Sequence, residues 1–315
     1  MRGLGPLAVA GGVVVAVVAI VVIVLLARDD GPPAGTAPGT ATTAPATPAT
    51  VPGTAPVPPA PEPVPDPGDF PGAPPENATV EVVRAEGGAA LEARYFDPAG
   101  RLTVVISALR AAPAPASSGV GAVVRCGSSA RADAGFRWTR FPIRWRLSSA
   151  AAPPRVRRAA ALAAIRKARG VWNATRSHCA GLGDASRARF LFAGSTPRRV
   201  ARDGVSTVDV GSLSALGGVC PGAVACTITW IAGGNRATES DTRITRSDPG
   251  GFSTARRPAA RRLDVQSVMV HESGHTLGFG HVSATDVVMN PFVKRGGISG
   301  RLLGRGDAVA SNAKY

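Results

Sequence analysis

The stretch that decides the fold runs from Asp264 to His281 and reads DVQSVMVHESGHTLGFGH. His271 and His275 are four residues apart, so on a helix they lie one turn above each other and can reach the same zinc ion. Gly278 is free to take a positive φ, which ends the helix and turns the chain so that His281 supplies a third nitrogen. The sequence therefore predicts a helix that begins near Asp264, ends at Gly278 and carries a zinc site with three histidine ligands.

The predicted zinc site has a general base beside it. Zinc with three protein ligands binds a water at its fourth position and lowers the pKa of that water to about 7. Glu272 follows His271 directly, so its carboxylate can take the proton of the water and pass it to a leaving amine. The chain has only four histidines, and the fourth, His178, lies outside the motif. We therefore expect one catalytic zinc ion and hydrolysis of peptide bonds.

The same residues resemble the metzincin signature H-E-x-x-H-x-x-G-x-x-H, and Val288-Met289-Asn290-Pro291 resembles the Met-turn of that group. Among the metzincins the matrixins are the most similar, because Leu303-Gly304-Arg305-Gly306-Asp307 resembles the start of their last helix. The resemblance implies that Met289 forms an apolar floor under the metal. It also implies that Asp307 holds the Met-turn by hydrogen bonds.

The likeness to matrixins extends over residues 126–315. Trp138 to Leu147, the helix after Pro154, and the runs Val205 to Val210, Val224 to Trp230 and Asp241 to Thr245 resemble successive matrixin elements. The implied fold is α+β, a twisted five-stranded mixed sheet with three helices. The resemblance makes Val224 to Trp230 the edge strand, to which a protein or peptide substrate would add as an extra strand. The second, structural zinc common in matrixins cannot form, because Ala225-Cys226-Thr227 contains no histidine.

The region before this domain divides into three parts. Residues 3–27 carry no charge and as a helix would be about 37 Å long, enough to cross a hydrocarbon core of about 30 Å, so we expect an uncleaved membrane anchor within residues 1–28. Residues 29–78 are rich in Pro, Ala and Thr, a composition typical of a disordered stalk. Residues 79–125 contain short β-rich runs separated by turn residues and predict a small β-rich segment. A helical prodomain like that of matrixins is missing.

The four cysteines bear on the compartment in which the protein works and on whether its zinc site is blocked by a thiolate. Cys126, Cys179, Cys220 and Cys226 suit two disulfides in an oxidising space, so we expect a single-pass protein of the cell membrane with an extracytoplasmic catalytic domain. We favour the pairs Cys220 with Cys226 and Cys126 with Cys179, which leave no odd thiol. The alternative is that Arg125-Cys126-Gly127, which resembles the matrixin cysteine switch, supplies a thiolate that blocks the open zinc position.

The charge and composition of the chain bear on functions other than peptide hydrolysis. The net charge of +15 comes from scattered arginines without interleaved aromatic residues, so we expect no binding to nucleic acid. A zinc-dependent cell-wall amide hydrolase and a catalytically silent adhesion or scaffold protein are the rival functions. Calcium is a further possible cofactor, with candidate oxygen ligands at Glu239, Asp241, Asp203 and Asp209. The sequence leaves the substrate and the oligomeric state open.

Overall fold

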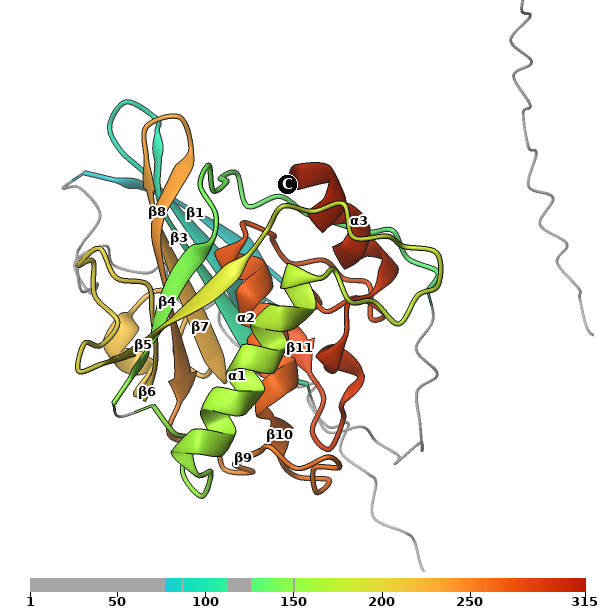
Figure 1. The fold of residues 1–315 in the computed structure, drawn as a ribbon. Coiled ribbons are helices and arrows are strands. Elements are labelled where there is room, and N and C mark those ends of the chain that lie inside the picture. The colour runs from blue at the N-terminus through green and yellow to red at the C-terminus, as the bar shows by residue number, and fades with distance from the viewer. Residues whose placement is uncertain (1–76, 86–87, 113–125, 150) are drawn as a thin grey trace, which may run out of the picture. The chain divides into compact units, whose positions relative to one another are not determined.

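The structure is a computed structural model, and it describes residues 77–85, 88–112, 126–149 and 151–315. The predicted anchor at residues 3–27 and the stalk up to residue 76 lie outside the described residues. Among the described helices, none has the length and apolar character needed to cross a bilayer. Figure 1 shows a large mixed sheet with helices packed against it.

The main sheet is built from nine strands in two regions. Its order is β1-β2-β3-β7-β8-β6-β4-β5, and β11 pairs with β3 beside this path. Strands β1, β2, β3, β7 and β8 are joined by antiparallel pairing, whereas β8, β6, β4 and β5 are joined by parallel pairing. The bounds are β1 (Thr79–Arg84), β2 (Ala90–Phe96), β3 (Leu102–Ala111), β4 (Ile143–Ser148), β5 (Phe190–Thr196), β6 (Thr207–Gly211), β7 (Ala225–Ala232), β8 (Arg236–Thr245) and β11 (Phe292–Val293). A separate two-stranded sheet joins β9 (Phe252–Ser253) and β10 (Leu263–Asp264).

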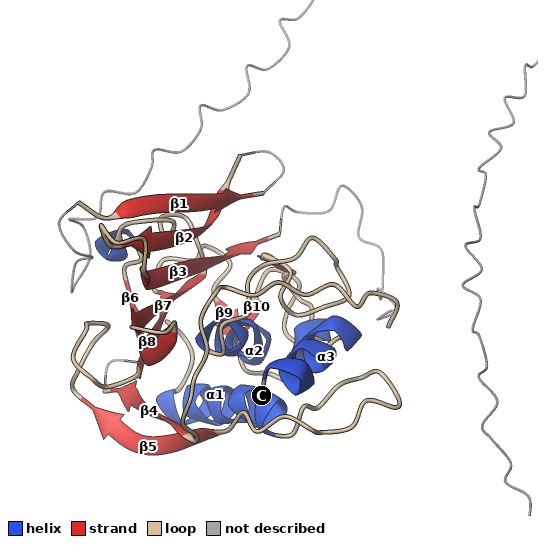
Figure 2. Ribbon diagram, turned by 90° about the horizontal axis from the view of Figure 1, so that it is seen from above, coloured by secondary structure: helices blue, strands red, loops and turns tan. Residues whose placement is uncertain are grey.

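Three α-helices are present among the described residues, as the resemblance implied: α1 (Arg158–Asn173), α2 (Val265–Thr276) and α3 (Arg305–Lys314). Two short 3₁₀ turns, η2 (Ser214–Leu216) and η3 (Ser299–Arg301), complete the helical elements. Figure 2 shows α1 and α2 on the same side of the sheet.

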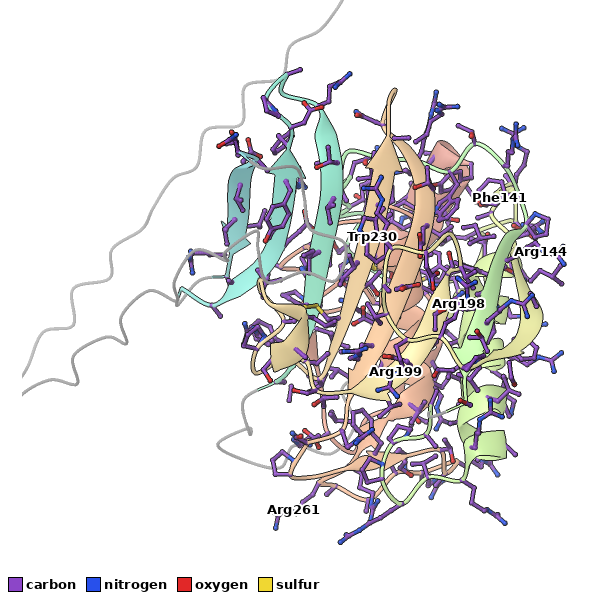
Figure 3. All side chains as sticks on the ribbon, turned by 90° about the vertical axis from the view of Figure 1, so that its left-hand side faces the viewer. Phe141, Arg144, Arg198, Arg199, Trp230 and Arg261 are labelled. Atoms are coloured by element: carbon purple, nitrogen blue, oxygen red, sulfur yellow. A yellow bond between two sulfur atoms is a disulfide. The ribbon has the colours of Figure 1, made fainter. Side chains whose placement is uncertain are left out.

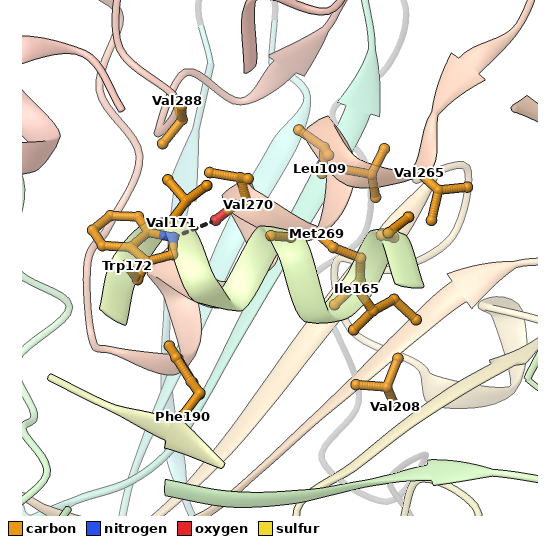
Figure 4. Close-up of a cluster of buried hydrophobic side chains, with 14 of the residues drawn as sticks. Leu109, Ile165, Val171, Trp172, Phe190, Val208, Val265, Met269, Val270 and Val288 are labelled. Carbon is orange, nitrogen blue, oxygen red and sulfur yellow. Dashed lines mark hydrogen bonds between the residues drawn. The ribbon is translucent and has the colours of Figure 1, made fainter. Parts of the chain in front are cut away.

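Helix α1 packs on α2 through one apolar stripe. Ile165, Ala168 and Trp172 recur at helical spacing and are buried. The indole nitrogen of Trp172 donates a hydrogen bond of 2.8 Å to the carbonyl oxygen of Val270 in α2 (Figure 4). Because this bond satisfies a polar group inside the core, it fixes the two helices in one register. This apolar stripe of α1 is therefore part of the core.

The expectation of a five-stranded sheet with Val224 to Trp230 at its edge is wrong. Strand β3 pairs with β7 in antiparallel register from Val104 opposite Trp230 to Leu109 opposite Ala225, and β1 and β2 continue the sheet outward. Figure 3 shows β3 directly beside β7, which carries Trp230. An unpaired strand edge exposes N–H and C=O groups, and β3 satisfies those of β7 from within the same chain.

The outer face of the sheet explains why β3 pairs there. The side chains of Val104, Ile106 and Ala108 belong to one buried cluster with Ile228 and Trp230 of β7. Alternate residues of both strands therefore bury apolar surface on this face. The β-rich segment of residues 79–125 thus contributes three strands to the main sheet.

Both disulfides form with the favoured pairing. Cys126 is bonded to Cys179 and Cys220 to Cys226, and no cysteine of the described chain is free. A sulfur held in a disulfide cannot act as a thiolate ligand. The structure therefore excludes the cysteine-switch alternative for Cys126 in this form of the chain.

Candidate metal centre

The start of α2 is fixed by a side-chain cap, and its end is fixed by the backbone conformation of a glycine. Asp264 caps the helix, because its carboxylate accepts a hydrogen bond of 2.9 Å from the backbone N–H of Ser267. Arg301 binds the same carboxylate at 2.6 and 2.9 Å. At the other end Gly278 has φ +80°, where a Cβ would meet the carbonyl oxygen of Phe136. The helix therefore ends where the sequence predicts and the chain turns.

The turn brings three imidazole nitrogens to one point. The Nε2 atoms of His271 and His275 lie 2.8 Å apart, those of His275 and His281 lie 3.0 Å apart, and those of His271 and His281 lie 3.1 Å apart. Tetrahedral zinc with Zn–N distances of about 2.0–2.1 Å needs nitrogens roughly 3.3 Å apart, which is close to this spacing. The structure thus brings together all three predicted ligands.

The three histidines are also in the protonation state that binds a metal ion. The Nδ1 atoms of His271 and His275 lie 2.6 Å and 2.8 Å from the carbonyl oxygens of Val288 and Phe279, so Nδ1–H donates to them and Nε2 keeps its lone pair. Burial lowers the pKa of His271 to about 4 and the pKa values of His275 and His281 well below their usual range. Neutral imidazoles are the form that binds zinc.

Glu272 is buried beside the histidines, and its two carboxylate oxygens differ in their hydrogen bonding. Oε2 accepts a hydrogen bond of 2.6 Å from the hydroxyl of Thr227. Oε1 is buried and has no hydrogen-bond partner among the described residues. Burial raises the pKa of Glu272 to about 8, while the bond from Thr227 acts in the opposite direction. One oxygen is thus held in place and the other is left to exchange a proton.

The turn after the histidines is braced by Asp307. Its Oδ2 accepts hydrogen bonds from the backbone N–H groups of Val288 at 2.7 Å and Gly304 at 2.8 Å, and its Oδ1 accepts one from Met289 at 3.3 Å. Met289 is 3 % exposed, and its sulfur packs where a side chain on Gly274 would stand. The structure thus places Met289 against the helix that carries the ligands.

A comparison with known families matches this region. Residues 226–311 match the family model for matrixin, from β7 through the histidines into α3. This part of the chain is a matrixin-like metalloprotease domain. No curated protein matches the chain in a sequence comparison. The family implies zinc as the metal, and the three histidines are the cluster that can hold it.

The candidate calcium ligands of the matrixin-like domain anchor a loop. Asp241 accepts hydrogen bonds from the backbone N–H groups of Ala201 at 2.9 Å and Thr207 at 2.6 Å. Glu239 accepts two more, from Asp203 at 3.1 Å and Gly204 at 2.8 Å. These carboxylates therefore fix the loop of residues 201–207 directly.

The remaining acidic candidates form ion pairs. Asp209 pairs with Arg243 at 2.7 Å and with Arg199 at 3.0 Å, and Asp203 pairs with Arg198 at 2.9 Å. Calcium binding by the matrixin-like domain stays a prediction.

Beside the histidines lies a cavity of about 1260 Å³. One wall comes from the chain after Met289, with Pro291, Phe292 and Val293. A second wall comes from the upstream strands and includes Leu91 and Leu109. Sequence reasoning missed this second wall and also Thr227, because the only signal for either is the pairing of distant strands.

Proposed function

We propose that this chain is a zinc-dependent endopeptidase that works outside the cytoplasm, held at the cell membrane by residues 3–27. The observation that carries the proposal is the convergence of the three Nε2 atoms, at most 3.1 Å apart, beside the buried carboxylate of Glu272. His271, His275 and His281 would hold the ion. Bound zinc supplies a Lewis acid and a water of lowered pKa.

The residues of the chain supply the proton transfers. Oε1 of Glu272 takes the proton of the attacking water and then delivers it to the nitrogen of the leaving amine. Thr227 holds Oε2, so the carboxylate cannot rotate away between the two transfers. The carbonyl groups of Val288 and Phe279 keep the rings of His271 and His275 in the orientation that directs Nε2 to the metal.

The match to a peptidase family favours this function over a cell-wall amide hydrolase. The complete set of histidines and Glu272 supports an active enzyme over a silent scaffold. The two disulfides support an oxidising compartment. Protease added to intact cells should degrade the domain, and complete protection of the domain would contradict the proposed location.

The test of the chemistry compares two variants of the full chain in detergent. Glu272→Gln should keep zinc and lower the turnover of a peptide mixture by about 10²–10⁴-fold, the range that a general base contributes. Glu81→Gln, a change of the same kind at an exposed position of β1, should leave turnover and zinc content unchanged. Unchanged turnover in Glu272→Gln would reject the assigned base.

A further inference from the structure

The end of strand β3 is held from both sides by the matrixin-like domain. On one side the carbonyl oxygen of Leu109 accepts a hydrogen bond of 2.8 Å from the N–H of Val224, just before β7. On the other side the N–H of Arg110 donates to the carbonyl oxygen of Pro291 at 3.0 Å, and β11 runs parallel to this part of β3. Residues 109–112 therefore lie as an extended peptide between β7 and the chain that follows Met289.

Leu109 anchors this peptide in the core beside α2. It is 1 % exposed and belongs to the buried cluster that includes Val265, Met269 and Val270 of α2 (Figure 4). Leu109 also lines the cavity that His271 lines. Its side chain thus fills apolar space between α2 and the cavity beside the histidines.

Two residues of β2 and β3 lie beside the residues that adjoin the proposed catalytic groups. Ser107 stands opposite Thr227, the residue that donates to Glu272, so the two side chains share one face of the sheet. Glu92 stands opposite Ser107 and is 1 % exposed. Its Oε2 lies 3.5 Å from the point where a Cβ on Gly280 would stand, directly before His281. The upstream strands thus place side chains against Thr227 and Gly280, the neighbours of Glu272 and His281.

No disulfide ties these strands to the domain they cover. Both disulfides lie between Cys126 and Cys226. The described contacts between β1–β3 and the rest of the chain are hydrogen bonds and apolar packing, so they can open without breaking a covalent bond. The covalent connection runs through residues 113–125.

We propose that β3 occupies the groove in which a substrate peptide binds, and that residues 77–112 hold the enzyme in a self-blocked form. This inference rests on the proposed function. An extended peptide binds a strand edge through its main chain, and β3 already uses that edge. A tethered segment has an effective concentration of about 1 mM, so even an affinity of about 1 μM for the groove would suppress activity roughly a thousandfold.

The first experiment cuts the tether in the full chain. A recognition sequence for a site-specific protease is inserted between Pro115 and Ala116, and peptide turnover is measured before and after cutting and removal of the released segment. The proposal expects turnover to rise at least about tenfold. The same protease acting on the chain without the insert is the control and should change nothing.

The second experiment uses matched substitutions in the uncut chain. Leu109→Glu places a charge in the apolar space beside α2 and should displace β3, raising kcat/KM at least about tenfold. Leu191→Glu makes the same change at a side chain that is 41 % exposed and should leave kcat/KM unchanged. Near-ultraviolet circular dichroism confirms that both variants are folded. Equal kcat/KM in both, with hydrolysis still dependent on Glu272, would overturn the self-block and keep the proposed function.

A binding measurement separates the two hypotheses. A labelled peptide with the sequence of residues 102–112 should bind the zinc-loaded chain from which the segment has been cut and removed, and should not bind the intact chain. The same peptide carrying Leu109→Glu should not bind either form. Binding of this pattern without turnover in any form would reject the proposed function and support the occupied groove. Failure of the unmodified peptide to bind the cut chain would overturn the inference.

Discussion

Glu272 and Asp307 are both buried carboxylates near the metal centre, but their neighbours give them different roles. Asp307 accepts three backbone hydrogen bonds through its two oxygens. Glu272 accepts one bond from Thr227 on Oε2 and has Oε1 without a partner among the described residues. A fully bonded carboxylate is fixed as a brace, whereas a half-bonded one can still take a proton. The hydrogen-bond environment of each residue thus supports the structural role proposed for Asp307 and the general-base role proposed for Glu272.

Replacing Asp307, whose carboxylate holds the turn after the histidines, should lower the stability of the protein. Asp307→Ala leaves three buried N–H groups without their acceptor, so we expect the free energy of unfolding to fall by about 2–4 kcal/mol. Chemical denaturation of the zinc-loaded chain measures this change. Asp133→Ala removes a carboxylate that is 64 % exposed and paired with Lys314, and it should cost about 1 kcal/mol or less. Equal losses in the two variants would show that Asp307 is not a brace.

Helix α2 carries two of the three candidate ligands, His271 and His275, and the proposed base Glu272, and the turn after it carries the third candidate ligand, His281. The helix is buried along almost its whole length, so its register cannot shift without moving every one of these groups. Gly278 adopts φ +80° at its end, and His281 follows three residues later. The position of the His281 side chain therefore depends on the backbone conformation of Gly278.

A substitution at this glycine should act on the metal. Gly278→Ala places a side chain at positive φ and against the carbonyl of Phe136, which should move His281 and weaken zinc binding at least about tenfold. Competition with a chromogenic chelator measures the affinity. Gly183→Ala is the control, because Gly183 has open space around it and no positive φ. Unaltered zinc affinity in Gly278→Ala would show that the turn tolerates a side chain.

The elements differ in how far the sequence determines them. The helix from Asp264 to Gly278 was predictable because its signals are local: a cap, ligands one turn apart and a terminating glycine. The number of cysteines predicted two disulfides, and the structure has the pairing that the sequence analysis favoured over the cysteine switch. The neighbour of β7 was not predictable, because the pairing of Val104 with Trp230 joins residues far apart in the sequence and any β-rich run of suitable pattern can supply such a strand. Thr227 was missed for the same reason, since its position beside Glu272 depends on how the sheet packs on α2.

At the scale of the whole molecule, the described chain combines a domain cross-linked by two disulfides with upstream strands that no disulfide ties to it. The parallel strands β4, β5, β6 and β8, the described helices and both disulfides lie within residues 126–315. The strands β1–β3 complete the sheet on the side of the metal centre. Exposed arginines such as Arg144, Arg198 and Arg261 are spread over separate elements (Figure 3). The proposed self-block requires β1–β3 to leave the groove, and no disulfide opposes that movement.

The central claim is a single zinc ion held by His271, His275 and His281, and elemental analysis of the purified full chain tests it most directly. The account predicts one zinc per chain, lost in His281→Ala and retained in His178→Ala, since His178 lies beside the bonded Cys126 and Cys179. A chain that binds no zinc, or a His281→Ala variant that keeps its full zinc content, would contradict it.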